Sequence, residues 1–384
     1  MNDRLSNINN LYNGFSYREK ECGSSDGFIL EKASEDLPKR IYFKRDNGYL
    51  VDHFVLSIFS RVSAKAPESK IHDIKHNGDS TFYLGTNGMT RSYMKNGVLK
   101  RQIFTHDSPE QRNLTKEQIK KFMVSLAKLR ILIYVFGLTD VHDHGMNIGC
   151  IDKYRNSNKS GIVKVGIVDF ITPIKHRIIN GSTICSWAPP YTNYFPYGGT
   201  ILESKVAEQL NTSIVPLLST FIQSCGVEEE PVVSDYRQAI NEIRHPKVKV
   251  FDENGYLVSS SEGKKTEFEK VLEEVFKDLK KECNTLRRGV ERPPRSSHNY
   301  SILSTLADDL KSVEIYKDII KRRFLDLESI VVEKNVLNKF VNSVPIVPLV
   351  ILSLFIMVLF ENWLYVYLFI FTYILIKALI YFIF

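Results

Sequence analysis

Residues 137–150, GLTDVHDHGMNIGC, bring two aspartates, two histidines and one asparagine together directly after a strongly apolar stretch. Further along, residues 164–170 read KVGIVDF, an apolar run that predicts a short buried strand ending at Asp169. Phosphoryl transfer needs one carboxylate to orient or deprotonate the acceptor, and a second carboxylate with an amide oxygen to hold Mg²⁺. The two segments carry these groups, so they predict the catalytic loop of a phosphotransferase.

A transition-metal cluster is the alternative interpretation of the loop. His142 and His144 are two residues apart and could in principle chelate one ion. No third histidine or cysteine stands at ligand spacing from them, which disfavours a zinc site. We therefore expect both histidines to orient the loop through hydrogen bonds.

The flanking sequence predicts a small β-rich lobe followed by helices. Residues 50–62 have apolar side chains at helical spacing, and residues 115–137 predict a long helix that starts with a capping box of Thr115 and Gln118. Gly137 ends that helix, and residues 266–281 predict a late amphipathic helix. Short β-like runs precede the long helix at residues 27–32, 40–46, 70–74 and 81–86.

The loop followed by GIVDF resembles the catalytic and metal-binding loops of the atypical protein-kinase-like superfamily. The resemblance is to its phosphoinositide-kinase, HipA-like and lanthipeptide-dehydratase branches, and to kinase-like effectors of intracellular bacteria. It spans residues 23–283 and implies an α+β, two-lobed protein-kinase-like fold, with the β-rich N-lobe at 21–105 and the helical C-lobe at 106–283. ATP and Mg²⁺ are the cofactors it implies, and a protein or a lipid is the implied substrate.

Individual residues match the motifs of that superfamily. RIYFKRD resembles the strand with the phosphate-contacting lysine, which would be Lys44. CGSSDG resembles a shortened phosphate-covering loop and includes Gly23 and Gly27. By the same resemblance, Asn147 and Asp169 would bind the metal.

The position of the catalytic base is open between two aspartates. In most kinases the loop aspartate lies five residues before the asparagine, and counting back from Asn147 reaches His142 instead. Asp140 matches the T-D-x-H element but needs a two-residue insertion, whereas Asp143 needs a one-residue deletion. We favour Asp140 as the base, and keep His142 and Asp143 among the candidate catalytic residues.

The usual glutamate partner of the lysine is missing. Residues 50–62 contain no glutamate, and the nearest acidic residue is Asp52, whose shorter side chain leaves the ion pair in question. This departure keeps two alternatives open within the same fold: a catalytically impaired pseudokinase and an AMP-transferring enzyme. An adaptor without a nucleotide site is the alternative from another class.

Composition limits the partners. A net charge of +7 with scattered basic residues does not form a nucleic-acid-binding stripe, so we expect no nucleic acid partner. The five cysteines include no C-x-x-C pair, which argues against a disulfide scaffold and favours a reducing compartment.

The C-terminal residues predict a membrane anchor. Residues 344–360 and 363–384 are apolar runs, and about 20 apolar residues span a bilayer, so we expect a transmembrane hairpin at 344–384. Lys334 and Lys339 precede it and predict a catalytic domain that faces the cytosol, on a host membrane if the protein is a secreted effector. Basic clusters at 287–288 and 321–323 would contact anionic lipids. The other predicted segments are a polar N-terminus at 1–20, a linker at 284–301 and an amphipathic juxtamembrane region at 302–343.

Overall fold

The fold was analysed in a computed structural model, which describes part of the 384-residue chain. The described residues are 12–20, 26–33, 37–45, 48–76, 79–95, 98–105, 115–138, 141, 147–155, 158–172, 231–251, 257–265, 267–290 and 297–328.

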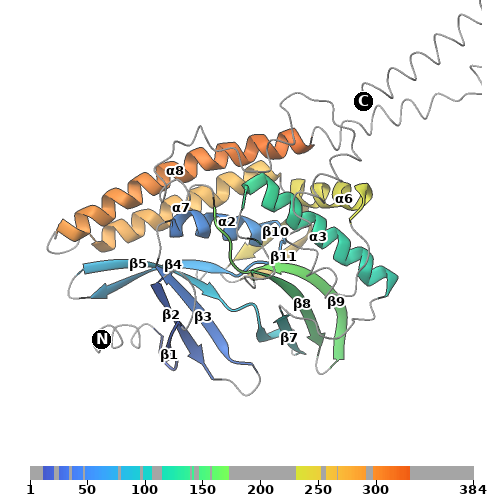
Figure 1. The fold of residues 1–384 in the computed structure, drawn as a ribbon, viewed down its shortest axis with the longest axis horizontal. Coiled ribbons are helices and arrows are strands. Elements are labelled where there is room, and N and C mark those ends of the chain that lie inside the picture. The colour runs from blue at the N-terminus through green and yellow to red at the C-terminus, as the bar shows by residue number, and fades with distance from the viewer. Residues whose placement is uncertain are drawn as a thin grey trace, which may run out of the picture.

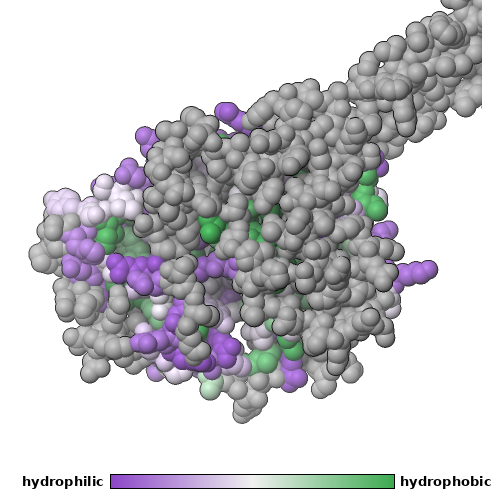
Figure 2. All heavy atoms as spheres, viewed as in Figure 1, coloured by the Kyte–Doolittle hydropathy of each residue, from purple (hydrophilic) through white to green (hydrophobic). Residues whose placement is uncertain are grey.

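The N-terminal part forms a five-stranded antiparallel sheet in the order β1-β2-β3-β5-β4 (Figure 1). Its strands are β1 (Ser16–Glu19), β2 (Asp26–Lys32), β3 (Lys39–Arg45), β4 (Ser69–His76) and β5 (Asp79–Asn87). Alternation along β3 buries Ile41 and Phe43 in a small apolar cluster on one face. Lys44 points to the other face, because it pairs with Leu84, which belongs to the main core. In the view of Figure 2, hydrophilic side chains gather over this sheet.

A second antiparallel sheet contains two strands that precede the long helix in the chain and two that follow it. Its order is β6-β7-β8-β9, and helix α3 (Lys116–Phe136) separates β7 from β8 in the chain. The strands are β6 (Arg91–Lys95), β7 (Val98–Thr105), β8 (Ile148–Arg155) and β9 (Asn158–Ile167). A separate hairpin pairs β10 (Lys247–Phe251) with β11 (Leu257–Lys265).

Helices cover one side of the strands. Helix α2 (Tyr49–Arg61) packs on β4 and β5, and α7 (Phe268–Val290) and α8 (Ser297–Glu328) lie beyond it (Figure 1). Helix α6 (Val233–Arg244) packs on α3. One continuous apolar core joins α2, α3, α6, α7 and α8. Strands therefore dominate the N-terminal region and helices the C-terminal region, which confirms the predicted α+β class and is consistent with two lobes.

Helices α7 and α8 extend into the segments that were predicted as a linker and an amphipathic juxtamembrane region. Helix α7 continues to Val290 because Cys283, Leu286 and Val290 extend its buried face. Arg287 and Arg288 lie in its last turn, where cations stabilise the helix C-terminus. Helix α8 packs into the main core through a row of buried side chains, Val313, Tyr316, Ile320, Phe324 and Leu327.

The predicted localisation, a membrane with the catalytic domain facing the cytosol, is corrected here. Among the described residues, no helix is long and apolar enough to cross a membrane. Charged residues interrupt the long helices: α8 carries them from Asp308 onward, and α3 holds Lys128 and Arg130 in its middle. The predicted hairpin at 344–384 lies outside the described residues.

Candidate nucleotide and metal site

Two predicted site residues from distant parts of the chain form an ion pair. The Nζ atom of Lys44 on β3 donates a hydrogen bond to Oδ1 of Asp169, which follows β9. The backbone N–H of Phe170 also donates to Asp169 Oδ1, at 3.0 Å, and so helps to fix the carboxylate. The side chain of Lys44 is 20% exposed and that of Asp169 is 40% exposed. The pair is therefore held by the fold and still open to a ligand.

The register of a hairpin places Asn147 opposite Val168, the residue before Asp169. Ile148 at the start of β8 pairs with Ile167 at the end of β9, so the residues that flank them meet at the same end of the hairpin. The N–H of Val168 donates to the carbonyl oxygen of Asn147 at 2.8 Å, and Asn147 is buried. An amide and a carboxylate thus stand at neighbouring backbone positions. Oxygen donors of these two kinds suit Mg²⁺, so the residues present fit the predicted metal.

Aromatic rings connect this site to three helices. Phe170 is buried and its ring lies 6.3 Å from that of Phe59 on α2. Phe59 meets Phe136 of α3 edge-on at 5.4 Å, and Phe136 in turn meets Tyr316 of α8 at 6.3 Å. The hydroxyl of Tyr316 donates to the carbonyl oxygen of Phe136 at 2.5 Å. The sequence predicted a helix at residues 50–62 but not that Phe59 on its buried face would contact Phe170.

Gly27 lies beside Lys44 in the sheet. It pairs directly with Lys44 across β2 and β3. A Cβ atom at Gly27 would lie 2.0 Å from the carbonyl oxygen of Phe43, so the strands approach too closely for any other residue. Gly23, the other glycine of the predicted phosphate-covering loop, lies outside the described residues.

Asp52 is placed in the first turn of α2 and is 3% exposed. Its charge acts on Tyr316 of α8: burial is the main cause that raises the pKa of Tyr316, Arg323 opposes the rise, and Asp52 adds to it. Lys44 makes its ion pair with Asp169. The structure therefore brings Lys44 together with Asp169 and places Asp52 within the electrostatic influence of α8.

The predicted catalytic residues Asp140, His142 and Asp143 lie outside the described residues, as does His144. Gly137 adopts φ 60° and ends α3, as the sequence predicted. Within the described part of the chain, no group of three or more His, Cys, Asp or Glu residues could hold a metal ion. The choice of base between the two aspartates stays a prediction.

A cavity of about 470 Å³ lies elsewhere, between α7 and α8. Cys283, Arg287 and Leu306 are among its lining residues, and none of the predicted site residues is. The candidate site is therefore defined by its side chains and not by this cavity.

Comparison with known proteins adds little. No protein-family model matches the sequence, and no curated protein matches it. Among solved structures, the chain is similar to the proinflammatory kinase CtkA of Helicobacter pylori, at 10% identity over 80% of this chain and 95% of that chain. The TM-score is 0.24, so the account of the fold rests on the elements described above.

Proposed function

We propose that the chain is an ATP-dependent, kinase-like phosphotransferase. The observation that carries the proposal is the ion pair between Lys44 and Asp169. These residues are 125 positions apart, and each was predicted for the site on the motif around it. A salt bridge that only stabilises the fold would not require an asparagine at the end of the same hairpin. A site for a metal and phosphates would use that asparagine as a second metal ligand.

The charges of the pair suit a nucleotide with its metal. Lys44 would bind phosphate oxygens, and Asp169 with Asn147 would hold Mg²⁺. When bound, Mg²⁺ neutralises the charge that develops on the transferred group. Each partner of the present ion pair would then gain a ligand of opposite charge, so the site is already arranged for both.

The reaction follows from these roles. The acceptor hydroxyl oxygen forms a bond to the γ-phosphorus of ATP while the bond from that phosphorus to the β–γ bridging oxygen breaks, and ADP leaves. The acceptor proton passes to a loop carboxylate, for which Asp140 is our first candidate and Asp143 the second. The acceptor would be a hydroxyl group of a protein or of a lipid.

Transfer of labelled phosphate by the full chain tests the proposal. The chain is incubated with Mg²⁺ and ATP labelled at either the γ- or the α-phosphate. The acceptors offered are the chain itself, casein and phosphatidylinositol vesicles. We expect label from the γ-position on an acceptor, and loss of that label in Lys44→Met and Asp169→Asn.

A matched control shows whether the loss of transfer is specific to Lys44 or follows from removing any positive charge on β3. Lys39 is exposed on the same strand, and Lys39→Met should keep wild-type transfer. Transfer of label from the α-position to an acceptor would show that the protein transfers AMP and not the γ-phosphoryl group. Binding of ATP without transfer would leave a catalytically impaired protein, and no binding of ATP at all would refute the proposal.

A further inference from the structure

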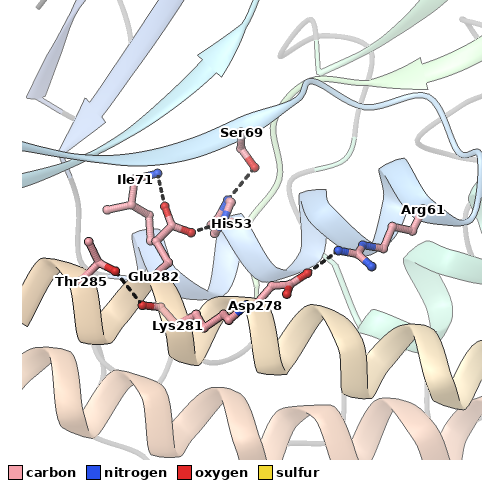
Figure 3. A network of polar contacts seen from close by, with 8 residues as sticks. All are labelled: His53, Arg61, Ser69, Ile71, Asp278, Lys281, Glu282 and Thr285. Carbon is pink, nitrogen blue, oxygen red and sulfur yellow. Dashed lines mark hydrogen bonds and ion pairs between the residues drawn. The ribbon is translucent and has the colours of Figure 1, made fainter. Parts of the chain in front are cut away.

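Helix α7 holds α2 against the N-terminal sheet through one carboxylate. Oε2 of Glu282 lies 3.0 Å from Nε2 of His53 on α2, and Oε1 accepts a hydrogen bond of 3.1 Å from the N–H of Ile71 on β4. Nδ1 of His53 lies 2.8 Å from the hydroxyl of Ser69, just before Ile71 in the same strand. Figure 3 shows these side chains converging between the strand, α2 and α7.

The register of the sheet relates this network to the candidate site. Ile71 pairs with Leu84 of β5, and Leu84 pairs with Lys44 of β3. Glu282 therefore binds the backbone directly two strands across from Lys44. The network on β4 and Lys44 on β3 are therefore separated by one strand, β5.

Helix α2 relates the network to the site by a second route. Six residues after His53, Phe59 packs on Phe170, the neighbour of Asp169. Helix α2 contains no glutamate, and Lys44 pairs with Asp169. Glu282 adds a polar contact from α7 to a helix that also packs into the main core.

The contacts of Glu282 are sheltered, whereas the other polar contacts between α2 and α7 are not. The side chains of His53 and Glu282 are 11% and 25% exposed. Burial opposes ionisation of Glu282, but the charge and hydrogen bond of His53, together with the Ile71 amide and Lys70, outweigh it, and the pKa of Glu282 is lowered. Arg61 of α2 also pairs with Glu274 and Asp278 of α7, at 3.3 Å and 2.5 Å, but both carboxylates are 58% exposed. Exposed pairs contribute little, so Glu282 is the stronger anchor.

We propose that Glu282 is a positioning residue of the phosphotransferase site, which fixes α2 between β4 and α7 and so holds Phe170 and Asp169 in place. Only the expected effect on kcat/KM rests on the proposed function; the effect on the position of α2 does not. The carboxylate of Glu282, from α7, contacts α2 and β4 at once.

Three variants of the full chain test this role. Glu282→Ala removes both contacts, Glu282→Gln keeps an acceptor for the Ile71 amide but loses the charge, and Glu274→Gln is the matched control on the same helix. We expect kcat/KM for ATP, measured well below the melting temperature, to fall roughly 10-fold in Glu282→Ala. Glu282→Gln should recover part of that loss, and Glu274→Gln should stay within about twofold of the wild type.

Amide hydrogen exchange over residues 49–61 gives a readout that does not depend on activity. Exchange of these amides should rise roughly 10-fold in Glu282→Ala and stay unchanged in Glu274→Gln. Unchanged exchange in Glu282→Ala would overturn the positioning role even if the chain transfers no phosphate. Faster exchange with wild-type kcat/KM would also overturn it, since α2 would then be loosened without consequence for the site. Absence of transfer in the wild-type chain would instead refute the proposed function.

Discussion

Replacing Gly27 by alanine would push β2 away from β3 at the position of Lys44. The added Cβ would lie 2.0 Å from the carbonyl oxygen of Phe43, 3.2 Å from its carbonyl carbon and 3.5 Å from Cα of Lys44. All three are backbone atoms, so no side-chain rotation relieves the contact. The two strands must separate locally, and the lysine must move with its strand.

The magnitude follows from the closeness of that contact. Inserting one methyl group into a closely packed region costs about 1–3 kcal/mol, because neighbouring backbone has to shift. A contact of 2.0 Å needs a displacement of more than 1 Å to reach ordinary packing distance, so we expect a value near the upper end, about 3 kcal/mol. The affinity for ATP should fall as well, because Lys44 Cα is one of the displaced atoms.

Gly88 offers a matched control at the other end of β3. A Cβ atom there would meet Arg40 and Tyr42 at 3.4 Å or more, which is ordinary contact. Urea unfolding of the full chain should show a large loss of stability for Gly27→Ala and a change of less than about 0.5 kcal/mol for Gly88→Ala. Equal stabilities of the two variants would refute the strand register on which the site is built.

Three further changes test other parts of the account. Phe59→Ala should lower the free energy of unfolding by about 3–5 kcal/mol, because the ring is fully buried among other rings. Tyr316→Phe should cost about 1–3 kcal/mol by leaving a buried carbonyl without its donor, and Tyr300→Phe, which alters an exposed ring, should cost almost nothing. Burial is the main cause that lowers the pKa of His72 from 6.5 to about 4. Between pH 4 and 6.5 the His72 side chain is therefore protonated in the unfolded chain and neutral in the folded chain. The free energy of unfolding should rise with pH across this range, and His72→Gln should reduce that rise.

Local sequence signals predicted the elements well where they act within one segment. Both hydrogen bonds of the capping box between Thr115 and Gln118 are present, and Gly137 ends α3 in the left-handed conformation. The helix predicted at residues 50–62 is observed at Tyr49–Arg61. Caps and periodic apolar residues depend on neighbours a few positions away, which is why a single sequence reveals them.

Local sequence signals could not predict which strands pair or which helices contact one another across long stretches of the chain. The sheet that joins β7 to β8 pairs Thr105 with Cys150, across the whole of α3, and no local pattern encodes that choice. The amphipathic face of α7 predicted burial but not its partners, so the contact of Glu282 with His53 was missed. Arg287 and Arg288 fall within the predicted linker at 284–301, and in the structure they lie in the last turn of α7.

Only part of the candidate site was predictable, and that part was found by motif resemblance and not by local secondary-structure signals. Lys44 and Asp169 were found because each lies in a motif that resembles a known one, and the structure shows that they form an ion pair. Asp52 was chosen as the nearest acidic residue in sequence, but nearness in sequence does not decide which face of a helix meets the lysine. Burial raises the pKa of Tyr316 most, and the charge of Asp52 adds to that rise.

Binding of ATP with and without Mg²⁺ tests the central claim most directly. Titration calorimetry of the full chain should show that Mg²⁺ tightens ATP binding, because the proposal makes Asp169 and Asn147 the oxygen ligands of the metal beside Lys44. In Asp169→Asn that gain from Mg²⁺ should disappear while metal-free ATP still binds, since Lys44 remains to meet the phosphates. ATP binding that Mg²⁺ tightens equally in the wild type and in Asp169→Asn would contradict the account.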